Sequence, residues 1–166
     1  MALQGNMVFS GLTDKQLATV ETYFKERVFR AHEVVVAEGE IGDEMFVIEA
    51  GRATVKVAGM KVADIPPQEV FGEVCLLEPG LRTASVIAGD EMHLWSIDTA
   101  TFNRLCHEHP ALALRIALNL LRLLGDRLRK ADAVIHLSRE ELDDLELPAE
   151  RNLIDRVMGI LNFGKE

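Results

Sequence analysis

The stretch from Phe71 to Val86 reads FGEVCLLEPGLRTASV, and it carries most of the functional information in this sequence. Gly72 allows a close approach of the backbone to another group. Residues 73–77 can form one helical turn, whose free N–H groups favour an anion. Arg82 follows a tight turn and can offer two parallel N–H groups to phosphate oxygens. The stretch therefore predicts a loop that binds phosphate.

Glu73 is an unusual residue for a phosphate site, because its negative charge repels the ligand. A carboxylate is useful there if it accepts a hydrogen bond from a ligand hydroxyl, such as the 2′-hydroxyl of a ribose. Taken singly, Glu73 and Arg82 could form a surface ion pair of little energetic value. The glycine, the turn and the run Arg-Thr-Ala-Ser-Val in register favour nucleotide binding instead.

The bulk composition is that of one globular domain with a small appendage. The sequence has 166 residues, of which 48% are hydrophobic and 27% are charged. No apolar run approaches the roughly 18 residues that span a bilayer, and the N-terminus lacks the pattern of a secretory signal. Cys75 and Cys106 stand far apart and fit a reducing compartment. We therefore expect a cytoplasmic protein that does not contact membranes.

Charge and side-chain chemistry argue against nucleic-acid binding and against catalysis. The formal net charge is −9, whereas DNA binding needs a basic face. The histidines lack metal-ligand spacing, and no Ser-His-Asp order or Cys-His pair suggests a nucleophile. We expect no enzymatic activity, no metal and no cofactor.

The pattern of short apolar runs and glycine turns predicts a mainly β protein with flanking helices. A capping-box spacing at Thr13 and Gln16 begins a helix that should end near Phe24. Antiparallel strands in a sandwich or barrel-like roll are expected afterwards. Their predicted ranges are Val28–Arg30, Val34–Ala37, Met45–Glu49, Ala53–Val57, Lys61–Asp64, Ala84–Ala88 and Met92–Ile97.

Two further helices should follow the strands, one from Thr99 to about His107 and a long one over 111–135 that Pro110 begins. Leucines and an isoleucine form one stripe on the long helix, and more leucines occupy the opposite side, so the helix needs cover on two sides. The roll provides one cover. A second copy of the chain, packed along residues 112–128, would provide the other.

Residues 138–166 read as an acidic helical extension to a domain that spans residues 1–137. Ser138 and Glu141 have capping-box spacing, and Leu153–Leu161 is amphipathic. The extension holds eight acidic and four basic side chains.

The stretch 71–86 resembles the phosphate-binding cassette of the cyclic-nucleotide-binding domain family, which includes catabolite-activator-type regulators, regulatory subunits of cAMP-dependent kinase and cyclic-nucleotide-gated channels. The resemblance covers residues 9–136. The motifs Glu38-Gly39, Gly42-Asp43, Met45-Phe46-Val47-Ile48 and Gly51-Arg52 resemble the first hairpins of that family. It implies an antiparallel β-roll, or jelly roll, with an N-terminal helix and C-terminal B and C helices.

The resemblance also implies a ligand, cAMP or cGMP, and a role for each cassette residue. Glu73 would bind the ribose 2′-hydroxyl, and Arg82 with Thr83 would bind the cyclic phosphate. The cradle would be completed by Gly72, Val74, Cys75, Leu76 and Ala84, with Cys75 and Leu76 acting through their amides. Arg127 on the C helix would reach the base, or would be a solvated surface residue. Cys75 departs from the small residue usual at its position, which should adjust packing only.

Three functions remain open at this point. The first is a stand-alone nucleotide sensor that acts on an unidentified downstream protein. The second is an interaction protein with the same fold and an empty pocket. The third is a cupin-like enzyme, for which the metal ligands are missing. Direct DNA binding is not expected, because the residues after the C helix are few and net acidic.

Overall fold

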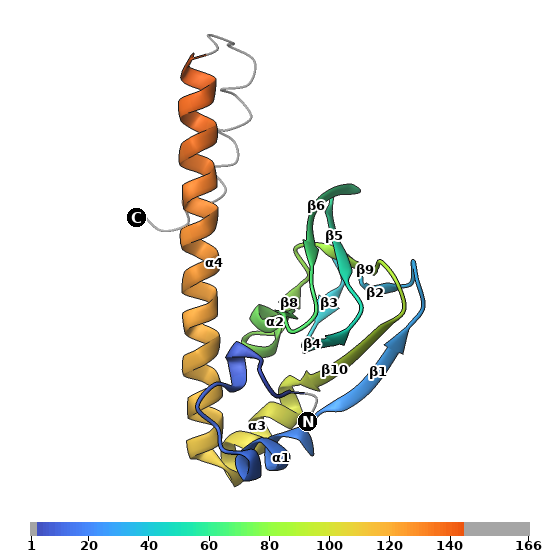
Figure 1. Cartoon of the computed structure of the whole chain (residues 1–166), viewed down its shortest axis with the longest axis vertical. Coiled ribbons are helices and arrows are strands. Elements are labelled where there is room, and N and C mark those ends of the chain that lie inside the picture. The colour runs from blue at the N-terminus through green and yellow to red at the C-terminus, as the bar shows by residue number, and fades with distance from the viewer. Residues whose placement is uncertain (1–2, 145–166) are drawn as a thin grey trace. The chain divides into compact units, whose positions relative to one another are not determined.

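The computed structural model describes the backbone of residues 3–144 and the side chains of residues 3–133. The chain divides after Leu121 into two units, Met1–Leu121 and Arg122–Glu166. The first unit contains every strand of the described residues, and Figure 1 shows its elements in chain order from blue to yellow.

Two four-stranded antiparallel sheets and one two-stranded ladder make up the β structure, which confirms the predicted roll. The strand orders are β1-β10-β4-β7, β2-β9-β5-β6 and β3-β8. Their bounds are β1 Lys25–Phe29, β2 Val34–Val36, β3 Ile41–Gly42, β4 Glu44–Ala50, β5 Ala53–Val57, β6 Met60–Ile65, β7 Val70–Phe71, β8 Gly80–Leu81, β9 Ser85–Ala88 and β10 Met92–Asp98.

The core lies inside the roll, where the two larger sheets face each other. Its members are large apolar or small side chains at alternate strand positions, as expected for strands with one buried face. Phe46 and Phe71 stack there with ring centroids 5.0 Å apart. The buried cluster consists of Phe46, Ile48, Ala53, Phe71, Val86, Ala88, Met92 and Leu94.

Helices gather at one end of the roll. They are η1 (Met7–Phe9), α1 (Asp14–Glu21), α3 (Thr99–Glu108) and the start of α4 (Pro110–Asp144). The predicted capping box begins α1: the Gln16 amide donates to Thr13 Oγ1 at 3.4 Å, and the Thr13 amide donates to Gln16 Oε1 at 2.9 Å. As predicted, Pro110 begins the long helix.

Within the first unit, α4 is held by its buried stripe and by one buried amide. Leu112, Ile116 and Leu120 are buried. The Asn119 side chain donates to the carbonyl oxygens of Val8 and Ser10, each at 2.9 Å. The N-terminal turn is therefore tied directly to this helix.

Helix α4 continues without a break to Asp144, so the prediction of a new helix at Ser138 is wrong. A polar residue with capping potential does not end a helix when the residues on both sides favour it. Residues 145–166, with the predicted amphipathic run Leu153–Leu161, lie outside the described part of the chain. The boundary between domains 1–137 and 138–166 stays a prediction.

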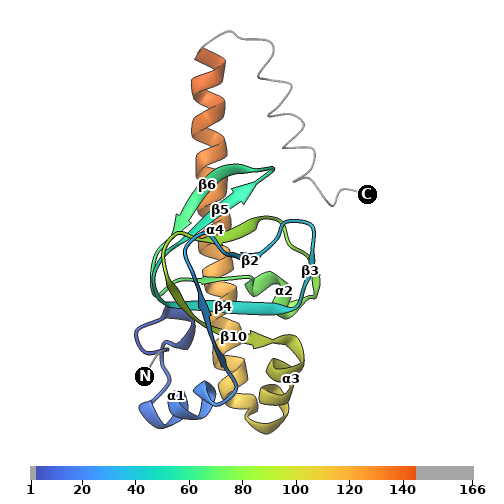
Figure 2. The ribbon, with the colours of Figure 1, turned by 90° about the vertical axis from the view of Figure 1, so that its right-hand side faces the viewer.

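Three very short elements, β3, β7 and β8, surround α2 (Glu73–Leu77) and bring the cassette residues together. Figure 2 shows α2 and β3 on the same side of the roll. Contacts of α2 with β4 and α3 fix its position. Within the described residues, no helix is both long and apolar enough to cross a membrane.

Candidate functional site

Gly72 connects β7 to α2 in a conformation that few other residues adopt. Its φ is +77°, in the left-handed region, and it is the N-cap of α2. A Cβ atom at this position would lie 2.6 Å from the Glu44 carbonyl oxygen and 2.6 Å from Arg82 Nη1. Both the backbone turn and the space around it therefore require glycine.

Arg82 is buried beside this turn, with only 8% of its surface exposed. Its backbone is fixed on both sides: its amide donates to the Glu40 carbonyl at 2.8 Å, and its carbonyl accepts from the Gly39 amide at 2.9 Å. The guanidinium carbon lies 5.9 Å from the centroid of the Phe46 ring. The side chain thus points into the protein and is held by an aromatic face.

One nitrogen of this buried guanidinium is left without a hydrogen bond. Nη1 of Arg82 has no partner among the residues that the structure describes. Burying a charged group with an unsatisfied N–H is costly, by several kcal/mol in order of magnitude. An anion with several acceptor oxygens would remove that cost, and phosphate matches the fork of a guanidinium. The arrangement fits a phosphate group.

Three of the five residues of the cassette helix are turned inward. Glu73, Cys75 and Leu76 are buried, whereas Val74 is 57% exposed. The amide of Leu76 donates to the Gly72 carbonyl at 3.2 Å within the helix, and the thiol of Cys75 lies 3.7 Å from the Gly80 carbonyl oxygen. After Arg82 the chain leaves the interior, with Thr83 exposed and Ala84 half-buried. Each of these residues stays a predicted ligand contact.

Comparison with known protein families identifies the domain that contains this site. A family model described as cyclic nucleotide-binding domain matches residues 26–109. The chain belongs to this family. The matched residues include the whole cassette, residues 71–86.

Relatives in the family are much longer proteins. The human potassium/sodium hyperpolarization-activated cyclic nucleotide-gated channel 2 is 27% identical over 162 residues, which are 96% of this chain and 18% of the channel. The cAMP-dependent protein kinase regulatory subunit of Blastocladiella emersonii is 33% identical over 113 residues, which are 65% of this chain and 28% of the subunit. The chain spans only a minor part of either relative.

Solved structures show the same cyclic nucleotide-binding fold. The catabolite activator protein of Thermus thermophilus has a TM-score of 0.71 and 27% identity, over 81% of this chain and 63% of that one. A cyclic nucleotide-binding domain from Methylobacillus flagellatus has a TM-score of 0.74 over 80% of each chain, and its 20% identity supports the fold alone.

The structure adds Gly42 and Phe46 to the cassette, which sequence reasoning did not assign to the site. A Cβ atom on Gly42 would lie 2.1 Å from Arg82 Nε. In the sequence, Gly42 and Phe46 were recognised only as parts of a hairpin motif. No local pattern connects them to Arg82: Gly42 meets it where β3 pairs with β8, and Phe46 reaches it from β4 only in the folded roll.

Arg127, the predicted contact to the base, lies on α4 in the second unit. The two units are described separately, so its role stays a prediction from the family resemblance.

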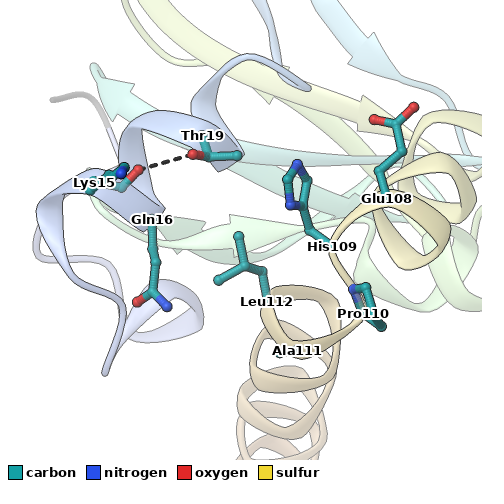
Figure 3. A pocket seen from close by; sticks show the side chains of 8 residues that line it. All are labelled: Lys15, Gln16, Thr19, Glu108, His109, Pro110, Ala111 and Leu112. Atoms are coloured by element: carbon teal, nitrogen blue, oxygen red, sulfur yellow. Dashed lines mark hydrogen bonds between the residues drawn. The ribbon is translucent and has the colours of Figure 1, made fainter.

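A hollow of about 410 Å³ lies outside the cassette, between α1 and the junction of α3 with α4 (Figure 3). Of its lining residues only Leu112 is buried, so it is an open surface groove.

Tyr23 joins the same elements, because its hydroxyl donates to the Glu108 carboxylate and its ring meets His109 edge-on at 6.1 Å. The hydrogen bond to Glu108 raises the pKa of Tyr23, since the carboxylate holds the phenolic proton in place.

Proposed function

We propose that this chain is a nucleotide sensor that binds cAMP or cGMP in the cassette formed by residues 71–86. The observation that carries the proposal is the buried guanidinium of Arg82, whose Nη1 lacks a partner among the described residues. In the proposed complex, the cyclic phosphate of the nucleotide accepts from that guanidinium. The function needs neither a metal nor a cofactor, and it is regulatory.

Other cassette residues would bind other parts of the nucleotide. Glu73, buried at the first position of α2, would accept a hydrogen bond from the ribose 2′-hydroxyl. Thr83 follows Arg82 directly, and its hydroxyl can serve the phosphate or the 2-amino group of a guanine. We favour cAMP as the ligand because cAMP is the more general ligand of the family.

We further propose that binding is transmitted through α4 to a second copy of the chain. Three leucines of the first unit, Leu114, Leu118 and Leu121, are exposed by 61%, 42% and 59%. Their spacing of four and three residues places them on one face of the helix, as in a coiled-coil seam. A homodimer through residues 112–128 would cover this face. A downstream protein would respond to the change that nucleotide binding causes in α4.

The cytoplasmic location is part of the same proposal. It rests on the two cysteines, Cys75 and Cys106, which are both free, as expected in a reducing compartment.

Calorimetric titration with cAMP and with cGMP tests the proposal. The protein should first be unfolded, dialysed and refolded, so that no carried-over nucleotide occupies the cassette. Wild type should bind at least one nucleotide saturably, and Arg82→Ala should bind neither detectably. Arg30→Ala, which removes an exposed arginine between β1 and β2, outside residues 71–86, is the matched control and should bind as wild type does.

Folded wild-type protein that binds neither nucleotide would contradict the sensor function. It would favour the alternative of an interaction domain with an empty pocket. Circular dichroism of each variant separates loss of binding from loss of fold.

A further inference from the structure

We infer that Gly42 is a positioning residue for the phosphate site: the absence of a side chain at Gly42 lets the Arg82 guanidinium lie where it can meet the ligand. The inference rests on the proposed function and deepens it, since it assigns a role to a residue that does not itself contact the nucleotide.

The space beside Gly42 is filled by Arg82. A Cβ atom on Gly42 would lie 2.1 Å from Nε, 2.4 Å from Cζ and 2.7 Å from Nη2 of that arginine. These separations are far below van der Waals contact, so alanine and arginine cannot both occupy their present positions. The three clashing atoms belong to the charged head of the side chain, and any relief of the clash must displace that head.

The backbone gives no separate reason for glycine at this position. Gly42 is absent from the residues with positive φ, in contrast to Gly72 at +77°. An L-amino acid could adopt its conformation without strain. Gly42 is also buried, so a new methyl group could not turn into solvent. Contact with Arg82 is therefore the physical reason for glycine at position 42.

Gly42 and Gly72 together form a slot for the guanidinium. A Cβ on Gly72 would approach Nη1 and a Cβ on Gly42 would approach Nε and Nη2. The ring of Phe46 lies against the same group. These three neighbours hold the Arg82 guanidinium in one orientation before a ligand binds. This preorganisation lowers the entropic cost of binding.

The chain supplies its own matched control in Gly80. Gly80 is the direct partner of Gly42 in the β3–β8 ladder. A Cβ there would meet nothing closer than the Glu78 carbonyl oxygen at 3.8 Å, an ordinary contact, and its φ is not positive either. Alanine substitutions at the two positions change the same ladder by the same methyl group, and only one of them reaches Arg82.

The first experiment compares nucleotide affinity in Gly42→Ala and Gly80→Ala by calorimetry. Gly42→Ala should weaken binding about tenfold or more, the scale expected from overpacking by one methyl group. Gly80→Ala should stay within about threefold of wild type, since its methyl group meets only an ordinary contact. Equal affinity of Gly42→Ala and wild type would overturn the inference.

The second experiment needs no nucleotide and keeps the inference testable if wild type fails to bind. Melting temperatures are measured for Gly42→Ala, Arg82→Ala and the double variant. Gly42→Ala should lower the melting temperature by roughly 3–8 °C when Arg82 is present. It should change the temperature little when residue 82 is alanine, because the clash is then gone. An equal fall in melting temperature with arginine and with alanine at position 82 would mean that the β3–β8 pairing, and not Arg82, requires glycine at position 42.

The two experiments fail in different ways. If wild type binds no nucleotide, the proposed function is wrong, and the melting temperatures still decide whether Gly42 places Arg82. If wild type binds and Gly42→Ala binds equally well, the function stands and the positioning role is wrong.

Discussion

The hydroxyl of Thr99, the first residue of α3, lies 2.9 Å from the carbonyl oxygen of Leu76, in the last turn of α2. The same hydroxyl is 3.4 Å from the Cys75 carbonyl oxygen and 3.0 Å from that of Asp43. The Thr99 amide also donates to Asp43, at 2.9 Å. One residue therefore joins the cassette, the β3–β4 corner and α3.

Thr99→Val should remove the hydroxyl contacts of this junction while keeping the shape of the side chain and the backbone bond to Asp43. Loss of the hydrogen bond should cost about 1 kcal/mol, which urea denaturation measures directly. Nucleotide affinity should also fall several-fold, because α2 loses its side-chain hydrogen bond to α3. Thr22→Val, which removes an exposed hydroxyl that donates to the Thr19 carbonyl oxygen at 2.7 Å at the C-terminal cap of α1, should leave affinity unchanged. Unaltered affinity in Thr99→Val would show that the junction serves stability alone.

Glu73→Gln should remove the preference for a ribose hydroxyl. Wild type should bind cAMP more tightly than 2′-deoxy-cAMP by roughly 10- to 150-fold, since a hydrogen bond to a charged acceptor contributes about 1.5–3 kcal/mol. In Glu73→Gln the two nucleotides should bind more nearly equally, and a double-mutant cycle gives the coupling. A discrimination that is the same in both proteins would place the ribose elsewhere.

Asp98 should make the stability of the fold dependent on acid pH. It is the N-cap of α3 and accepts from the Thr101 amide at 2.7 Å. The pKa of Asp98 is lowered chiefly by a hydrogen bond with the Thr101 side chain and next by the hydrogen bond from the Thr101 backbone amide. The hydrogen bond and positive charge of Lys25 lower it less. The carboxylate therefore stabilises the fold at pH values above the ordinary aspartate pKa, and this contribution is lost as pH falls through the lowered value.

Asp98→Ala should lose about 0.5–2 kcal/mol at pH 7, the usual range for an N-cap. The difference from wild type should shrink as the pH falls below 3.8, the ordinary value for aspartate. Asp98→Asn keeps a capping oxygen without a charge and should retain most of the stability at pH 7. Denaturant titrations at pH 7 and at pH 3 measure this; a difference between Asp98→Ala and wild type that is the same at both would refute it.

The exposed leucine face should control association. Wild type should have the mass of two chains by light scattering after gel filtration. Leu118→Glu combined with Leu121→Glu should give the mass of one chain, because charged residues are unfavourable in an apolar seam. Its melting temperature should be less dependent on protein concentration than that of wild type. Lys130→Glu alters an exposed residue of α4 and should leave the mass at two chains; a monomeric wild type would refute the proposed dimer.

The longer elements were predictable because their signals are local. The strands Met45–Glu49, Ala53–Val57 and Met92–Ile97 were predicted within one or two residues of their observed ends. The α1 start at Thr13 was predicted from its capping residues alone, whereas the helix ends at Glu21 and not near Phe24. Strand β3 was missed because a two-residue strand has no periodicity to detect.

The site was predictable to the extent that it is continuous in sequence. Gly72, Glu73 and Arg82 lie within one stretch, and the structure places Gly72 against Arg82. Gly42 was not assigned to the site, because its contact with Arg82 depends on the pairing of β3 with β8. Phe46 lies on β4 and was not assigned either, since only the folded roll places its ring against the guanidinium.

The paired glycines of the β3–β8 ladder also determine which substitutions the domain can accumulate over evolutionary time. Position 80 can accept alanine at any time, because its methyl group would displace nothing. Glycine at position 42 can be replaced only after Arg82 has been replaced. That earlier substitution removes the guanidinium that would bind the phosphate. Descendants of this sequence that have abandoned the ligand should therefore lose the arginine first and the glycine afterwards, which makes residue 42 a delayed marker of lost binding.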